Sequence, residues 1–139
     1  MDRLKVSKIL IVDDSALFKE TFKEILQTRF PSIEIHDATD GEKAIRKIKT
    51  SPPDIIFMDI NLPGKNGLVL AQKIKVRYPN IVIVLFTGWN LPEYQEASIR
   101  CKADYLLFKG SATQQEIFAL VESVLVHSNH GRETLSKII

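Results

Sequence analysis

Short apolar runs alternate with longer amphipathic stretches five times along the chain. The apolar runs have the length of strands and lie at residues 8–12, 33–38, 54–58, 81–86 and 105–108. After each run, apolar residues recur at helical spacing, as Phe18, Phe22, Ile25 and Leu26 do after the first. Strict alternation of strand and helix is typical of a parallel sheet that helices cover on both faces.

Capping and turn residues indicate where the predicted helices begin and end. Ser15 is a candidate N-cap of the first helix, and Asp40 with Gly41 opens the second. Pro92 stands at a first-turn position of the fourth helix. Prolines end the first three helices, at Pro31, Pro52-Pro53 and Pro79. The last helix covers about residues 113–126.

The apolar pattern also predicts the order of the strands in the sheet. The first, third and fourth runs are almost continuously apolar, which is typical of strands buried on both faces. Ile33-Glu34-Ile35-His36 alternates instead, as expected of an edge strand with His36 facing solvent. The order 2-1-3-4-5 fits this pattern, and it is the order of flavodoxin-like folds. We therefore expect an α/β protein, a flavodoxin-like (βα)5 doubly wound sandwich around a parallel five-stranded sheet.

Four of the predicted strands end on a polar side chain that can bind phosphate or metal. In chain order these side chains are Asp13 with Asp14, then Asp59, Thr87 and Lys109. The carboxyl ends of the strands in an open parallel sheet lie along one edge, where ligands bind. The sequence therefore predicts one pocket that holds three carboxylates, a hydroxyl and an ammonium group.

These residue types suit phosphoryl transfer assisted by a divalent cation. Three carboxylates at one edge repel one another unless a cation neutralises them, and hard oxygen ligands with open positions suit Mg²⁺. Lys109 and Thr87 can hold the oxygens of a phosphoryl group, and Asp59 can attack phosphorus to form an acyl phosphate. Simpler structural roles are also open for these residues. The acidic pair or Thr87 could cap a helix, and Lys109 could lie in solvent.

Composition is typical of one globular domain. The 139 residues are 45% hydrophobic, and the net charge of +2 is too small to indicate nucleic acid or a membrane surface as a partner, so neither is expected. The single cysteine, Cys101, is expected to pack as a small apolar residue, which fits a reducing, cytoplasmic compartment. No apolar run is long enough to span a membrane. The densest basic group is interpreted as the solvated face of a helix, and it comprises Lys43, Arg46, Lys47 and Lys49.

Four short motifs lie at the predicted strand ends. They are Asp13-Asp14-Ser15, Met58-Asp59-Ile60-Asn61-Leu62-Pro63-Gly64-Lys65-Asn66-Gly67, Phe86-Thr87-Gly88 and Ala103-Asp104-Tyr105-Leu106-Leu107-Phe108-Lys109. In their order and spacing the chain resembles the receiver domains of bacterial two-component response regulators, over about residues 6–126. We therefore expect a receiver domain at 1–126 and a C-terminal tail at 127–139.

The resemblance implies a phosphoacceptor and a set of metal ligands. Asp59 would take a phosphoryl group from a histidine on a sensor histidine kinase or phosphotransfer protein. Asp14 would bind Mg²⁺ directly and Asp13 mainly through water. Asp59 and the backbone carbonyl of Asn61 would complete the protein ligands of the metal.

The resemblance also implies phosphoryl-binding groups and an output surface. Thr87 would bind the phosphoryl group and move on activation, while the Gly88 N–H and Lys109 would contact its oxygens. Such a domain catalyses its own phosphorylation and slow dephosphorylation, so we expect a switch rather than an enzyme that turns over a substrate. The helix from Pro92, the strand 105–108 and the last helix would form the signalling surface, for an unidentified effector protein or for a homodimer.

Several positions depart from the pattern of that family. Gly110 follows Lys109 where the family usually has proline, so the family's frequent cis bond is not expected. Leu106 occupies the place of the switch aromatic, and Tyr105 should point to the other face of the strand. Trp89, two residues after Thr87, would either shield an acyl phosphate from water or face a partner.

Two other functional classes compete with the switch. A haloacid-dehalogenase-like phosphatase uses an aspartyl nucleophile with Mg²⁺, but it needs a second aspartate two residues later, where this chain has Asn61. A flavodoxin-like cofactor binder is disfavoured because an acidic pocket repels the phosphate of FMN. His127 and His130 are interpreted as solvated residues at the end of the last helix.

Overall fold

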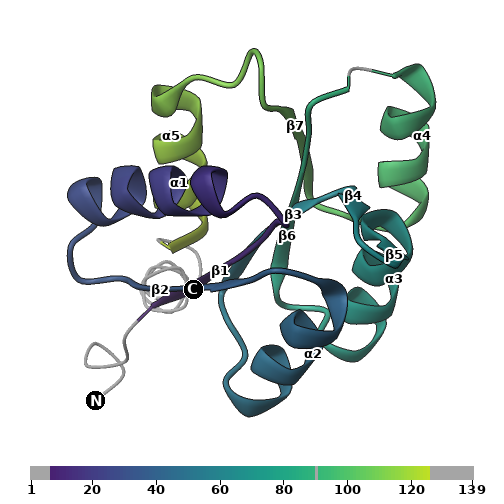
Figure 1. The fold of residues 1–139 in the computed structure, drawn as a ribbon, viewed down its shortest axis with the longest axis horizontal. Coiled ribbons are helices and arrows are strands. Elements are labelled where there is room, and N and C mark those ends of the chain that lie inside the picture. The colour runs from purple at the N-terminus through teal and green to yellow at the C-terminus, as the bar shows by residue number, and fades with distance from the viewer. Residues whose placement is uncertain (1–6, 90, 126–139) are drawn as a thin grey trace, which may run out of the picture.

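A five-stranded parallel sheet forms the centre of the molecule in a computed structural model, which describes residues 7–89 and 91–125 (Figure 1). Its strands lie in the order β2-β1-β3-β6-β7. This order confirms the predicted 2-1-3-4-5 arrangement, since β6 and β7 are the fourth and fifth long strands. The bounds are β1 (Lys8–Val12), β2 (Glu34–Ala38), β3 (Ile55–Asp59), β6 (Val82–Thr87) and β7 (Tyr105–Phe108).

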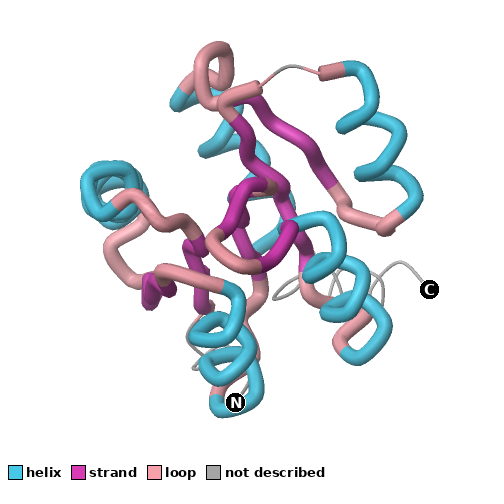
Figure 2. Tube along the Cα trace, turned by 45° about the vertical axis from the view of Figure 1, so that its right-hand side comes forward, coloured by secondary structure: helices cyan, strands magenta, loops and turns pink. Residues whose placement is uncertain are grey.

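Helices cover both faces of the sheet, as the alternating pattern predicts. The helices α1 (Ala16–Arg29) and α5 (Gln114–Leu125) lie on one face. The other face carries α2 (Gly41–Thr50), α3 (Gly67–Arg77) and α4 (Pro92–Arg100) (Figures 1 and 2). Within the described ranges, none of these helices has the length and apolar character needed to cross a bilayer.

Alternation along the strands divides the core into two layers. Leu10 and Ile56 pack with residues of α2 and α3, whereas Ile9 and Phe57 point the other way, toward α1 and α5. All four side chains are at most 2% exposed. The buried strands therefore have apolar residues at consecutive positions because both faces of the sheet are covered.

The helix boundaries follow the predicted capping signals. The Ser15 hydroxyl accepts a hydrogen bond from the N–H of Phe18 at 3.1 Å. The Asp40 carboxylate accepts one from the N–H of Lys43 at 2.9 Å, and Pro92 is the first residue of α4. Side-chain oxygens thus satisfy N–H groups that the first helical turn leaves without partners.

The segment between β3 and α3 is more ordered than the sequence pattern indicates. It contains a small antiparallel hairpin of β4 (Asn61–Leu62) and β5 (Lys65–Asn66), with Gly64 at a φ of 70° in its turn. A two-residue strand is too short to show an alternating pattern, so the sequence carries no signal for this hairpin. The predicted tail at 127–139, with His127 and His130, lies outside the described residues.

Candidate functional site

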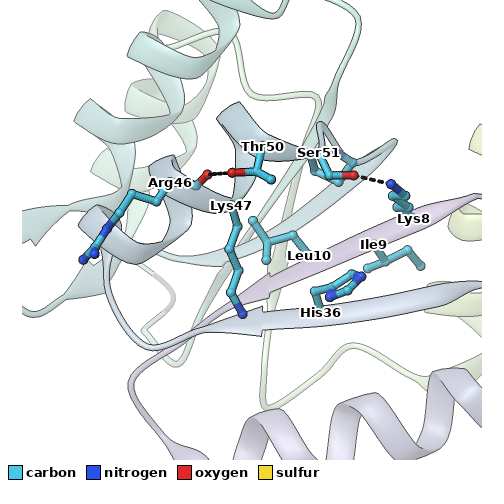
Figure 3. Close-up of a pocket in the computed structure, with 9 residues that line it drawn as sticks. Lys8, Ile9, Leu10, His36, Arg46, Lys47, Thr50 and Ser51 are labelled. Atoms are coloured by element: carbon cyan, nitrogen blue, oxygen red, sulfur yellow. Dashed lines mark hydrogen bonds between the residues drawn. The ribbon is translucent and has the colours of Figure 1, made fainter.

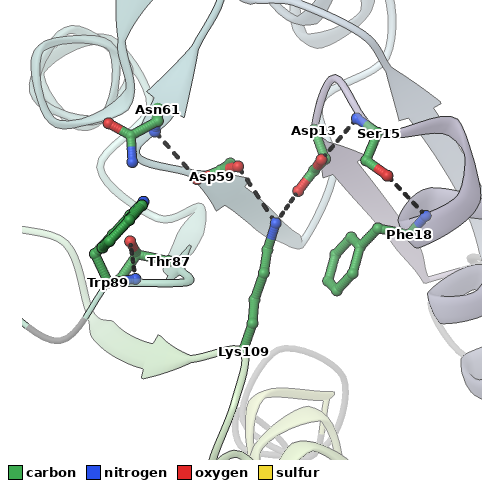
Figure 4. A network of polar contacts seen from close by, with 8 residues as sticks. All are labelled: Asp13, Ser15, Phe18, Asp59, Asn61, Thr87, Trp89 and Lys109. Atoms are coloured by element: carbon green, nitrogen blue, oxygen red, sulfur yellow. Dashed lines mark hydrogen bonds and ion pairs between the residues drawn. The ribbon is translucent and has the colours of Figure 1, made fainter.

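The carboxyl edge of the sheet gathers the polar residues that follow the strands (Figure 4). Val12 pairs with Met58 in the register of β1 and β3, so Asp13 and Asp59 leave neighbouring strands at the same level. Thr87 pairs with Phe108 across β6 and β7, which places Lys109 one residue beyond this pair. The sheet topology therefore brings together residues that are far apart in the sequence.

Three carboxylates meet at this edge. One oxygen atom from each of Asp13, Asp14 and Asp59 lies within 4.8 Å of the others. Asp13 is 1% exposed and Asp59 is 9% exposed, whereas Asp14 is open to solvent. The backbone N–H of Ser15 donates to Oδ1 of Asp13 at 2.8 Å. The acidic pair is therefore more than a helix cap, because Ser15 caps α1 and Asp13 faces the other carboxylates.

Lys109 places its ammonium group between two of the carboxylates. Its Nζ atom lies 2.6 Å from Oδ2 of Asp13 and 3.3 Å from Oδ2 of Asp59. The same atom lies 4.2 Å from the centre of the Phe18 ring, a cation–π contact. The Lys109 side chain is only 24% exposed, so the structure does not support the alternative of a solvated surface lysine.

Burial and charge act in opposite directions on the two central groups. Burial raises the pKa of the Asp59 carboxyl above its ordinary value, although the Asn61 N–H and the Lys109 charge oppose this effect. Burial alone would lower the pKa of Lys109, but its hydrogen bond to Asp13 and the charges of both aspartates raise it overall. The ammonium form of Lys109 is thus stabilised, while the charge of Asp59 is only partly compensated.

Thr87 is fully buried at the end of β6. Its hydroxyl oxygen accepts a hydrogen bond from the backbone N–H of Trp89 at 3.1 Å, and its carbonyl accepts one from the N–H of Lys109 at 2.8 Å. Gly88 follows on the surface, and the Trp89 side chain is 63% exposed. In the view of Figure 4 the indole lies between Thr87 and Asn61.

The hairpin holds Asn61 beside the carboxylates. Its backbone N–H donates to Oδ1 of Asp59 at 3.1 Å. A shallow hollow of about 540 Å³ lies alongside, bordered by Asp14, Asn61 and the rest of the hairpin. The open side of the acidic cluster therefore has room for a ligand to approach.

Gly67 brings the start of α3 against the backbone of Asp59. A Cβ atom at Gly67 would overlap the carbonyl oxygen of Asp59 and lie 2.8 Å from the Cα of Ile60. The N–H of Gly67 also donates to the Ile60 carbonyl at 2.6 Å. Only glycine fits here without displacing the end of β3.

The donor set fits a hard divalent cation. All three side-chain ligands are carboxylates, and the structure gives the exposed Asp14 carboxylate no hydrogen-bond donor among the described residues. Oxygen ligands of this kind suit Mg²⁺, which retains several waters and needs few protein groups. The cluster can therefore hold a metal ion at its open side, while Lys109 contacts the buried side.

Two roles were missed by sequence reasoning. Phe18 was assigned only to the core face of α1, yet its ring also contacts Lys109. The closeness of Gly67 to Asp59 was not predicted either. Helical periodicity says which face a residue occupies but not which strand end lies opposite, so neither contact had a signal in the sequence.

The structure also bears on the expectations for Gly110, Leu106 and Cys101. The described residues contain no cis peptide bond, so Lys109 and Gly110 are joined by a trans bond. Leu106 packs against the core layer of α2–α4, and Tyr105 is 42% exposed, as expected for neighbours on opposite faces. Cys101 is buried, and burial raises the pKa of its thiol, in agreement with the predicted packing role.

Comparison with known families gives one consistent match. The sequence model of the family described as the response regulator receiver domain matches residues 9–122. The transcriptional regulatory protein DegU of Brevibacillus brevis is 32% identical over 125 residues, which cover 89% of this chain and 51% of DegU. A protein-glutamate methylesterase/protein-glutamine glutaminase of Vibrio cholerae is 44% identical over 78 residues, or 56% of this chain and 22% of that protein. The chain therefore spans about half the length of DegU and less of the methylesterase.

Solved structures have the same fold. A CheY-like response regulator receiver domain protein from Methanospirillum hungatei superimposes with a TM-score of 0.80 at 24% identity, over 87% of this chain and 94% of that one. The signal receiver domain of an HD domain-containing protein from Pseudomonas fluorescens gives 0.82 at 22% identity, over 91% and 99% of the two chains. At these identities the similarity establishes the flavodoxin-like architecture.

Proposed function

The chain belongs to the response regulator receiver domain family, and on that premise we propose that Asp59 is its phosphoacceptor. As a receiver domain it works in phosphorelay signal transduction. The observation that best supports the role of Asp59 is the position of Lys109, whose ammonium lies 2.6 Å from Asp13 and 3.3 Å from Asp59. A cation held beside a buried carboxylate can stabilise the negative charge that arrives with a phosphoryl group.

Asp59 acts as the nucleophile. One carboxylate oxygen attacks the phosphorus of a phosphohistidine, the P–N bond breaks, and the imidazole leaves with the electron pair of that bond. The Asn61 N–H, 3.1 Å from Oδ1 of Asp59, orients the carboxylate so that its other oxygen can attack. The resulting acyl phosphate is later hydrolysed by water, so the domain is a self-catalysing switch rather than a conventional enzyme.

Asp13, Asp14, Asp59 and the backbone carbonyl of Asn61 would hold Mg²⁺. A bound Mg²⁺ would neutralise the carboxylates and supply positive charge for the oxygens of the phosphoryl group. The exposed position of Asp14 supports its assignment as a direct ligand. Asp13 is buried and already accepts hydrogen bonds from Lys109 and the Ser15 N–H, which favours contact through water.

Thr87, Gly88 and Lys109 would bind the phosphoryl oxygens. The Thr87 hydroxyl has its oxygen engaged by the Trp89 N–H but keeps its own hydrogen for donation. The N–H of the exposed Gly88 and the Lys109 ammonium supply two further donors. If the Thr87 hydroxyl binds the phosphoryl group, its hydrogen bond from the Trp89 N–H would transmit the movement to the turn that contains Trp89. The surface of this chain could then change although position 106 holds leucine and not an aromatic residue.

The phosphatase alternative is not favoured. Asn61 cannot transfer a proton as the second aspartate of a haloacid dehalogenase does. That reaction also leaves no role for Asp13 and Asp14, whereas both face Asp59 here. The family match points the same way.

Receiver domains of response regulators interact with histidine kinases and with effectors, and we propose α4, β7 and α5 as the output surface. Two exposed apolar side chains lie on this surface, Ile99 on α4 at 76% and Tyr105 on β7 at 42%. An effector protein or a second copy of the chain would cover them. Membership in this family also supports the cytoplasmic location expected from the sequence, and the match over residues 9–122 supports residues 1–126 as the receiver unit.

Incubation with acetyl phosphate and Mg²⁺, followed by intact mass measurement, tests the proposal. We expect a gain of one PO₃ unit that Asp59→Asn abolishes and that chelation of the metal prevents. The control is Asp54→Asn, which removes an aspartate at the other edge of the sheet. An adduct of equal yield in Asp59→Asn, or continuous release of phosphate from stable phosphate esters, would contradict the assignment.

A further inference from the structure

A cavity at the opposite edge of the sheet is surrounded by cationic side chains. It has a volume of about 290 Å³ and lies between α2 and the strands β1 and β2 (Figure 3). Lys8 begins β1 at this end, whereas Asp13 follows its other end. Asp13 is five residues beyond Lys8, and at 3.3 Å for each residue the two lie about 17 Å apart, so the cavity is distinct from the phosphoryl site.

The ionisable side chains that line the cavity are all basic. They are Lys8, His36, Arg46 and Lys47, and no aspartate or glutamate is among the lining residues. The chain as a whole is nearly balanced, with 19 lysines and arginines against 17 acidic residues. Such a one-sided lining does not follow from the composition.

The three permanent cations have no carboxylate partner among the described residues. The Lys8 ammonium donates to the hydroxyl of Ser51, and the Lys47 ammonium donates to the backbone carbonyl of Asp37. Arg46 forms no ion pair with a described residue. Both lysines therefore carry charge that neutral oxygens satisfy only in part, and an anion would complete their contacts.

Unlike the two lysines and Arg46, the fourth basic residue of the lining, His36, has an acidic neighbour. Its Nε2 atom lies 3.1 Å from Oε1 of Glu34, and both side chains are about half exposed. The positive charge at the cavity therefore comes from the two lysines and Arg46. A second hollow of about 280 Å³ beside it shares Arg46 and Lys47 and adds Lys43, so basic residues continue along α2, although Asp37 also borders this second hollow.

The floor of the cavity is apolar. Leu10, on the face of β1 that α2 covers, is 2% exposed, and the buried Pro53 borders the same space. A simple inorganic anion would leave this floor without a contact. A ligand with both an apolar body and an anionic group would satisfy the floor and the rim together.

We infer that this cavity binds a small amphipathic anion, with its apolar body against Leu10 and Pro53 and its charged group toward Arg46 and Lys47. The volume is at the lower end of the range of small-molecule sites, which runs from about 300 Å³ upward. This favours a compact ring system over a folded protein segment. The basic face of α2, expected from the sequence to be only solvated, is thereby assigned as one wall of a binding site.

Titration with anilinonaphthalene sulfonate tests the inference, followed by two-dimensional amide NMR. We expect shifts centred on Leu10, His36 and Thr50. N-phenylnaphthylamine, which has the same rings without the sulfonate, should bind more weakly. Inorganic sulfate alone should cause much smaller shifts than the complete probe.

Charge-reversal variants separate a specific site from general attraction. Arg46→Glu and Lys47→Glu should each raise the dissociation constant by about threefold to tenfold, the effect of one or two partly exposed ion-pair contacts. Lys49→Glu, with the same change in net charge on an exposed residue of α2 outside the cavity, should change it by less than about twofold. Thr50→Trp, at the rim of the cavity, should block binding while thermal melting shows that the fold is retained.

Four outcomes would overturn the inference. Equal binding of the neutral ring compound would leave an apolar patch without anion selectivity. Equal weakening by all three glutamate variants would indicate net charge alone. Shifts centred on Ile99 and Tyr105 would show that the probe binds another surface. The expected shifts with polyglutamate but not with the sulfonate probe would show that the cavity binds an acidic protein segment.

Discussion

The Nζ atom of Lys109 lies 2.6 Å from the Oδ2 atom of Asp13, although these residues come from opposite ends of the domain sequence. Because Asp13 is almost completely buried, the pair links β1 to the loop after β7 at the centre of the acidic site. Removing the lysine leaves buried negative charge without its main partner. This relationship leads to a direct test of stability.

Lys109→Met should lower the free energy of unfolding by about 1–3 kcal/mol in the absence of divalent ions. Urea denaturation monitored by circular dichroism measures the loss, with the exposed Lys49→Met as the control for removal of a charge. Millimolar Mg²⁺ should recover part of the loss, because the cation takes over compensation of the carboxylates. An unchanged free energy of unfolding of Lys109→Met without Mg²⁺ would mean that the contacts of Lys109 with Asp13 and Asp59 do not stabilise the fold.

The Phe18 ring should contribute to holding Lys109 in place. A double-mutant cycle with Phe18→Leu and Lys109→Met should give a coupling free energy of about 0.5–1 kcal/mol, the usual size of a cation–π contact at a partly exposed site. The cycle removes the contribution of Phe18 packing on Phe22, whose ring centre lies 5.5 Å away. Strict additivity of the two substitutions would show that the ring only fills space.

An ordinary aspartate titrates near pH 3.9. Asp59 should titrate at a higher pH than this when Mg²⁺ is absent. Burial raises its pKa in the folded state, so its contribution to stability is present at low pH and is lost as the pH rises through that folded pKa. Carbon-detected NMR of the carboxyl group measures the midpoint. Lys109→Met should move the midpoint higher still, since the ammonium lowers the pKa of Asp59.

The same linkage predicts the sign of a stability change. At neutral pH, Asp59→Asn removes a partly compensated buried charge and should therefore raise the melting temperature of the Mg²⁺-free protein. In saturating Mg²⁺ the difference should shrink or reverse, because the wild-type carboxylate then gains a ligand contact. A lower melting temperature for Asp59→Asn without metal would contradict the predicted direction of the pKa shift.

Gly67→Ala should damage both folding and phosphorylation. The new Cβ atom would overlap the carbonyl oxygen of Asp59, and the backbone there cannot yield as a flexible side chain would. We expect a loss of about 1–3 kcal/mol in the free energy of unfolding and slower phosphorylation by acetyl phosphate. Gly110→Ala is the matched control, with open space around the added methyl group and an expected effect within about 0.5 kcal/mol.

Trp89 should slow the loss of phosphoryl from Asp59. Its backbone is bonded to Thr87, and its indole lies toward Asn61, where it can limit the approach of water. Trp89→Ala should shorten the lifetime of the acyl phosphate, measured by phosphorus NMR or by mass at timed intervals, while Tyr105→Ala should not. Equal lifetimes of the acyl phosphate in Trp89→Ala and wild type would show that the indole does not shield it, and would favour a role of the indole in contacting a partner.

The sequence allowed the main site residues to be predicted because strand ends are visible in it. Apolar runs stopping at Asp13, Asp59 and Lys109, combined with the rule that parallel strands share a carboxyl edge, were enough to place these groups together. Capping by Ser15 and Asp40 was predictable for a similar reason, since a cap is a local interaction between residues three apart.

Contacts that depend on distances between elements were not predictable. The hairpin at Asn61 to Asn66 is too short for a periodic signal, and nothing local indicates that Gly67 touches the backbone of Asp59. The basic residues of α2 show the same limit. Their helical face was evident, but the cavity beneath Arg46 and Lys47 exists only because β1 and β2 pack below that face.

The hydrogen bond from the Trp89 N–H to the Thr87 hydroxyl has a practical consequence, because Trp89 is the single tryptophan in the chain. A movement of Thr87 either breaks this bond or carries the main chain of Trp89 with it, and both change the surroundings of the indole. The emission of this one fluorophore can therefore report occupancy of the acidic edge in real time, in unlabelled protein and without an added dye.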